Sequence, residues 1–126
     1  MRYLSADQVV AMHDVLLERW GGEPGGGHRG GAYEGAEAAV QAVRNSYYER
    51  VEELAAAYAV YIVQGHVFLD GNKRTGAAAV TTFCVLNGRT PRIEPDELFQ
   101  AMIELQERAV NGESTERLVA WLAGHL

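Results

Sequence analysis

The sequence has a single cysteine, Cys84, so it can form neither an internal disulfide nor a cysteine-based zinc site. Cys84 lies in an apolar segment, and free thiols in such segments are commonly buried. No base or helix start is placed beside it to make the thiol reactive. We therefore predict a buried cysteine without a catalytic role.

The sequence also lacks long apolar runs and an excess of positive charge. No run approaches the roughly 20 apolar residues of a membrane-spanning helix, and the first residues do not resemble a signal peptide. These absences predict a cytoplasmic protein without a membrane partner. The net charge of −6 argues against direct binding of nucleic acid, because neutralising phosphates needs a basic surface.

Strand patterns are missing as well, since no segment alternates polar and apolar residues over a sustained stretch. Strands are at most a short hairpin, either in the glycine-rich segment GGEPGGGHRGG (21–31) or around Arg89–Ile93. With 126 residues and 48% hydrophobic content, the chain has the size and core of one domain. We predict a single all-α domain, residues 1–126, that forms a bundle of about six helices.

Helical spacing and capping residues give the expected elements. Ser5 and Gln8 form a capping box before a first helix that ends near residue 20. Further helices are predicted from residue 34, over 49–64, over 73–86, over Pro95–Val110 and after Ser114. The helix over 73–86 is apolar on nearly all sides and is expected at the centre. The residues predicted to face inward are Val9, Val10, His13, Leu16, Leu17, Trp20, Ala36, Ala39, Val40, Val43, Val51, Leu54, Ala55, Tyr58, Ile62, Gly65, Leu98, Met102, Leu105, Ala109, Leu118, Val119, Trp121 and Leu122.

One stretch, GHVFLDGNKRTG (65–76), concentrates polar residues in the turn between the two most apolar helices. A helix N-terminus presents unpaired backbone N–H groups and a partial positive charge, which bind anions. Here the first turn also carries Lys73 and Arg74, although cations are normally disfavoured at that end. This pattern predicts a bound anion, and phosphate fits it best.

The neighbouring residues suit phosphate chemistry. Asp70 offers a hard carboxylate for a Mg²⁺ ion shared with phosphate oxygens. Asn72 can either donate to a phosphate oxygen or cap the helix, and Gly71 lets the backbone approach a ligand. His66 can act as a general base toward an attacking hydroxyl. Phe68 is expected to point into the core and fix the turn.

Simpler explanations exist for each of these residues. Asp-Gly-Asn is common in turns, a histidine at a helix end is often only a surface residue, and Lys-Arg is often solvated. Their co-occurrence in one turn between two buried helices favours a site. A nucleotide-hydrolase phosphate loop is excluded because Asn72, and not lysine, follows Gly71. The other histidines have no spacing that would complete a zinc site.

The residues His66 to Arg74, HVFLDGNKR, resemble the signature of the Fic/Doc superfamily, H-x-F-x-[DE]-x-N-[GK]-R. The opening segment RYLSADQVVAMHDVLLERWGGEPG, the segment TFCVLNG after the motif and the helix Pro95–Val110 resemble the death-on-curing branch of that superfamily. The adenylyl-transferring Fic enzymes carry glycine at the position of Lys73 and a second arginine at that of Ala77. Both differences point to the death-on-curing branch.

This resemblance implies a toxin that passes the γ-phosphate of ATP to a threonine of elongation factor Tu and stops translation. His66 would activate the acceptor hydroxyl and Asp70 would hold Mg²⁺. The residues in contact with the triphosphate would be Gly71, Asn72, Lys73 and Arg74. Lys73 and Arg74 are also predicted to be catalytic residues. The alternatives are a Fic-type protein adenylyl transferase and a non-catalytic interaction module.

The resemblance also implies how the activity of the protein is restrained. Death-on-curing toxins are held by a separate antitoxin whose C-terminal segment folds into a groove of the toxin. An in-chain inhibitory helix of pattern [ST]-x-x-x-E-[GN] is not expected, because Thr90 to Glu94 is followed by Pro95.

The segment Gly25–Val40, which aligns the target peptide in the superfamily, departs from the usual sequence.

Overall fold

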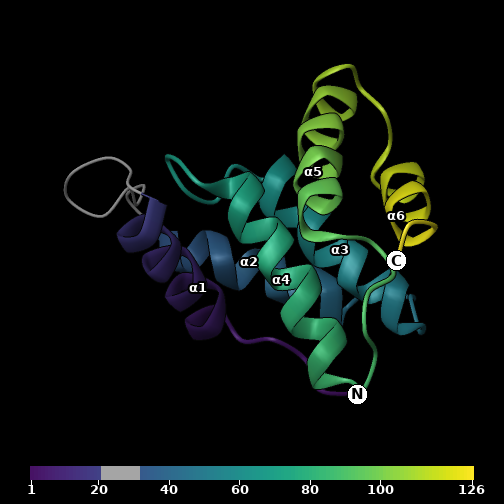
Figure 1. Cartoon of the computed structure of the whole chain (residues 1–126), viewed down its shortest axis with the longest axis horizontal. Coiled ribbons are helices and arrows are strands. Elements are labelled where there is room, and N and C mark those ends of the chain that lie inside the picture. Colours follow the sequence, from purple (N-terminus) through teal and green to yellow (C-terminus); the bar gives the residue numbers. More distant parts are fainter. Residues whose placement is uncertain (21–31) are drawn as a thin grey trace.

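The computed structural model describes residues 1–20 and 32–126, and this part of the chain contains six helices and no strand (Figure 1). The helices are α1 (Ala6–Trp20), α2 (Ala32–Arg44), α3 (Val51–Gln64), α4 (Asn72–Leu86), α5 (Pro95–Val110) and α6 (Thr115–Ala123). The all-α prediction is confirmed. The alternative of a hairpin around Arg89–Ile93 is wrong, because these residues form neither strand nor helix. The other predicted location, residues 21–31, lies outside the described residues.

The centre of the bundle is α3, not α4 as the composition predicts. α3 packs against α2, α4, α5 and α6, and every residue from Leu54 to Val60 is buried. α4 buries only the face that carries Ala79 and Phe83, and its Val85 is 63% exposed. Small residues such as alanine and threonine fit both a core and a surface, so the composition of α4 did not reveal its exposed side.

Three of the predicted helix ends are confirmed by their hydrogen bonds. The backbone N–H of Ser5 donates to Gln8 Oε1 at 2.8 Å, and the N–H of Gln8 donates to Ser5 Oγ at 3.1 Å. Gly88 has φ 75°, and the N–H of Arg89 closes the end of α4 on the carbonyl of Cys84 at 2.9 Å. Ser114 caps α6 by accepting from the N–H of Arg117.

Most of the predicted inward-facing residues are buried, and the side chain of Trp20 lies outside the described part of the structure. Half-buried residues of this set are Val10, Leu16, Leu17, Val51 and Ala109. Gly65 is exposed because it follows the last turn of α3 as its cap. Trp121 is only half-buried, and the guanidinium carbon of Arg108 lies 4.5 Å from the centre of its ring. Cys84 is fully buried, and burial raises the pKa of its thiol, as expected for a cysteine without a catalytic role. Among the described residues, no helix has the length and apolar character needed to cross a membrane.

The start of the chain is tied to the core by a buried hydroxyl, which gives a first prediction. The Oη atom of fully buried Tyr58 accepts the backbone N–H of Leu4 at 2.9 Å, and burial raises the pKa of Tyr58. Tyr58→Phe leaves this N–H without its acceptor and is expected to lower the free energy of unfolding by about 1–3 kcal/mol. Chemical denaturation measures this loss. Tyr33→Phe is the control, because Tyr33 is 51% exposed, and equal losses for the two variants would contradict the prediction.

Candidate functional site

The predicted site is the turn that joins α3 to α4, and its backbone is strained at one residue. His66 has φ 46°, a left-handed conformation that is uncommon for a residue other than glycine. Gly71 has φ 84°, and a Cβ atom at this position would lie 3.3 Å from Cδ2 of His13. Gly71 was predicted to admit a ligand, and the close neighbour in the structure is this imidazole. Strained residues of this kind persist only when their surroundings hold them.

Asn72 holds the turn from inside. Its Oδ1 accepts the N–H of Phe68 at 3.0 Å, and its Nδ2 donates to the carbonyl of Phe68 at 2.8 Å. The prediction that Asn72 caps α4 is wrong, since the N-cap is Gly71 and the Asn72 side chain faces the turn. Phe68 is 1% exposed, which confirms that it points into the core. The contact of Asn72 with phosphate remains a prediction.

Asp70 has an exposed side chain beside the start of α4. Its Oδ1 accepts the N–H of Gly71 at 2.8 Å, which orients the carboxylate. Within residues 1–20 and 32–126, no group of three histidine, cysteine, aspartate or glutamate residues is arranged to hold a metal ion. A Mg²⁺ ion at Asp70 would therefore take its other ligands from phosphate oxygens and water, as this ion commonly does.

The two cations of the motif lie in the first turn of α4 and contact α5. Lys73 Nζ donates to Gln106 Oε1 at 2.9 Å, and the guanidinium carbon of Arg74 lies 4.8 Å from the centre of the Phe99 ring. In the described part of the chain, Lys73 has no carboxylate partner. Its charge at the positive end of a helix is therefore uncompensated, and an anion bound there would be stabilised.

His66 presents an exposed side chain on the α3 side of the same turn. Exposure leaves the imidazole accessible to a hydroxyl group on a second molecule, which a general base requires. The turn and the first residues of α4 thus carry a potential base, a carboxylate and two cations within residues 66–74. These groups can bind a phosphorylated ligand and remove a proton from a hydroxyl beside it.

His13 is a part of this region that the motif does not reveal. It was predicted only as an inward-facing residue of the first helix, and the structure buries it completely. Its Nε2 atom donates to the backbone carbonyl of Asp70 at 2.7 Å. A histidine on the apolar face of a helix needs a polar partner inside the protein, and that requirement is the signal in the sequence that could have predicted such a contact.

A groove of about 950 Å³ runs beside the cations, between α1, α4 and α5. Its lining is mostly apolar and includes Leu16, Ala77, Leu98 and Phe99, with Arg74 among them. Arg74 lines the groove and also belongs to the first turn of α4. A molecule bound in the groove would therefore lie next to the proposed phosphate position.

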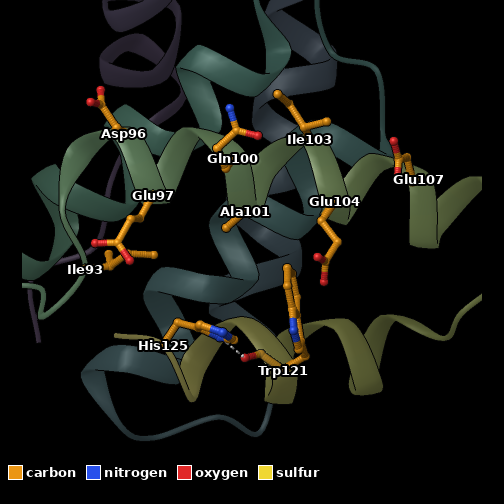
Figure 2. Close-up of a pocket in the computed structure, with 10 residues that line it drawn as sticks. All are labelled: Ile93, Asp96, Glu97, Gln100, Ala101, Ile103, Glu104, Glu107, Trp121 and His125. Atoms are coloured by element: carbon orange, nitrogen blue, oxygen red, sulfur yellow. Dashed lines mark hydrogen bonds between the residues drawn. The ribbon is translucent and has the colours of Figure 1, made fainter.

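A different groove, of about 580 Å³, separates α5 from α6. Figure 2 shows Glu97 and Glu104 extending from α5 toward the side where Trp121 of α6 and His125, which follows α6, lie. The carboxylates that line this groove are Asp96, Glu97, Glu104 and Glu107. Such a lining repels a triphosphate, so this groove does not suit the anion that the turn predicts.

Comparisons with known proteins agree with the motif. A family model described as the Fic/DOC family matches residues 3–84, which include α1 and the whole turn between α3 and α4. Over 90 residues the chain is 39% identical to a protein of Escherichia phage P1 named Protein kinase doc. The match covers 70% of this chain and 70% of the phage protein.

Proposed function

The chain belongs to the Fic/Doc family, and we propose that it transfers the γ-phosphate of ATP to a hydroxyl group of a protein. The observation that carries the proposal is the pair of cations, Lys73 and Arg74, in the first turn of α4. His66 and Asp70 lie just before them, in the connection between α3 and α4. The name of the phage relative, a protein kinase, supports the same reaction class. The target to test first is elongation factor Tu.

In this proposal each residue of the turn has a separate task. A ring nitrogen of His66 accepts the proton of the attacking hydroxyl group, and the oxygen of that hydroxyl forms a bond to the γ-phosphorus. The bond from that phosphorus to the leaving ADP oxygen breaks, and Lys73 and Arg74 stabilise the negative charge on the phosphate oxygens. Asp70 would hold Mg²⁺, which neutralises charge on the triphosphate when it is bound.

The residues that separate phosphate transfer from adenylyl transfer are Lys73 and Ala77. Lys73 adds a cation where adenylyl-transferring members of the family have glycine. Ala77 lines the groove beside Arg74 and provides no second guanidinium there. A Fic-type adenylyl transfer remains the alternative, and a label on the nucleotide separates the two reactions.

The experiment incubates the purified protein with elongation factor Tu, Mg²⁺ and ATP labelled at either the α or the γ phosphorus. Phosphate transfer moves only the γ label to the protein, and this is the expected result. Transfer of the α label instead would establish the adenylyl reaction. If neither label moves to this target or to other proteins of a cell extract, the chain is a non-catalytic interaction module.

We further propose that the protein is a cytoplasmic toxin restrained by a separate antitoxin. The apolar groove between α1, α4 and α5 fits the C-terminal segment of such a partner, since a helix with one apolar face would cover Leu16, Leu98 and Phe99. A bound segment would also crowd Arg74 and hinder nucleotide binding. Residues 90–94 are not helical, so they do not form an in-chain inhibitory helix.

The contact between Lys73 and α5 gives a prediction for nucleotide affinity. Gln106→Leu removes the acceptor that holds Lys73 Nζ, and ATP is expected to bind about 3- to 10-fold more weakly, as for the loss of one hydrogen bond. Calorimetry measures the affinity. Gln100→Leu is the matched control, because Gln100 is exposed on the same helix and has no hydrogen bond to Lys73. Unchanged affinity for Gln106→Leu would mean that Lys73 reaches the phosphate without help from α5.

A further inference from the structure

We infer that His13 is a positioning residue for the reaction, because it fixes the main chain of the turn that carries His66 and Asp70. The inference rests on the proposed phosphate transfer, but the contacts that support it do not depend on it. His13 belongs to α1, and 57 positions of the sequence separate it from Asp70. No residue of α1 forms part of the motif.

One imidazole contacts three residues of the turn. The Nε2 atom of His13 lies 2.7 Å from the carbonyl oxygen of Asp70. The ring stacks on Phe68 with the centroids 3.7 Å apart and the planes 3° from parallel. Gly71 has no side chain, which lets the ring pack closely against it; a Cβ atom on residue 71 would lie 3.3 Å from Cδ2 of His13. These three contacts hold the ring against the peptide that follows Asp70.

The bond also fixes the tautomer of His13. A carbonyl oxygen only accepts hydrogen bonds, so Nε2 must carry the hydrogen. Because His13 is completely buried, water cannot replace this donor. The carbonyl of Asp70 would lose a short hydrogen bond inside the protein if the donor were removed.

The side-chain hydrogen bonds of Asn72 and Asp70 cannot do this task. Asn72 bonds to Phe68, and Asp70 bonds to Gly71, so each of these contacts joins two residues of the same short segment. Such bonds define the shape of the segment but move with it. The bond from His13 connects the segment to α1. It therefore contributes to where the Asp70 carboxylate and the His66 imidazole lie relative to the rest of the bundle.

Packing also anchors the turn, since Val67 and Phe68 are 5% and 1% exposed. Loss of the His13 bond should therefore shift the turn without unfolding the protein. A shift of about 1 Å at reacting groups can cost about 100-fold in rate. The inference thus predicts a loss of kcat that exceeds what the change in stability explains.

Two variants separate positioning from simple packing. His13→Leu fills the space without a donor, and His13→Gln keeps an N–H donor at a similar reach. We expect kcat for γ-phosphate transfer to fall about 10- to 100-fold in the leucine variant, with KM for ATP changed less than about threefold. The glutamine variant should recover most of the loss. If His13→Leu does not fold, His13→Asn replaces it, because its shorter side chain places the donor out of reach.

A control variant tests whether stability alone accounts for the loss. Tyr58→Phe removes a buried hydrogen bond to Leu4, at the start of the chain. It should lower stability and leave kcat unchanged. Equal losses of kcat in His13→Leu and Tyr58→Phe, or in His13→Leu and His13→Gln, would overturn the inference and make His13 a core residue only.

Hydrogen–deuterium exchange provides a measurement that needs no activity. In His13→Leu the backbone amides of residues 66–72 should exchange faster than in the wild type, while those of α3 keep their protection. Unchanged exchange over residues 66–72 would overturn the inference. If the wild-type protein transfers no phosphate, the proposed function fails, and the exchange comparison still decides whether His13 fixes the turn.

Discussion

Replacing His66 with alanine is expected to abolish phosphate transfer and to leave nucleotide binding intact. In the proposed reaction His66 is the group that removes the proton from the attacking hydroxyl. Loss of a general base typically costs about 10²- to 10⁴-fold in rate. In the same proposal Lys73, Arg74 and the start of α4 hold the phosphate, so the affinity for ATP should change little. Transfer of γ label and calorimetry with ATP measure the two quantities.

The backbone at His66 requires a second variant. The φ of 46° is unfavourable for alanine, so His66→Ala also disturbs the turn. Asparagine tolerates the left-handed conformation and cannot act as the base, which makes His66→Asn the matched variant. Both variants should lose transfer. If His66→Asn retains wild-type transfer, the loss in His66→Ala comes from the backbone and the role assigned to the imidazole is wrong.

Replacing Arg74 with alanine is expected to weaken ATP binding by about 10- to 100-fold. A charge-assisted hydrogen bond to phosphate contributes about 1.5–3 kcal/mol, which corresponds to this change in Kd. The variant also removes the cation that lies 4.8 Å from the ring centre of Phe99. Calorimetry gives the affinity, and Arg117→Ala on α6 is the control because Arg117 is exposed there.

A lysine at position 74 shows which property of Arg74 matters. Arg74→Lys keeps the positive charge but loses the planar fork, which in the proposal bonds phosphate in two places and which lies over the Phe99 ring. Its affinity for ATP should lie between those of the wild type and Arg74→Ala. Equal affinity in the wild type and in Arg74→Ala would remove Arg74 from the phosphate site.

Part of this protein could be predicted from neighbouring residues alone. The capping box of Ser5 and Gln8, the glycine end of α4 at Gly88 and the start of α5 at Pro95 all appear in the structure. The candidate site was predicted for the same reason, since His66 to Arg74 are consecutive. A helix terminus, its cap and its charges are set by groups within a few positions of each other.

Four features depended on the tertiary structure. Composition favoured α4 as the central helix, but the structure gives this place to α3. The contact of His13 with Asp70 joins residues 57 positions apart, and that of Lys73 with Gln106 joins residues 33 positions apart. Phe99 likewise reaches Arg74 only because α5 packs beside α4.

The sequence by itself therefore determined the helices, their ends and the chemical groups of the turn, because helical spacing and capping act over one or two turns of chain. Only the tertiary structure decided which helix lies at the centre and which residues hold the turn in place. Those outcomes depend on how whole faces of helices pack, and one buried imidazole on α1 contacts the turn only after that packing has formed.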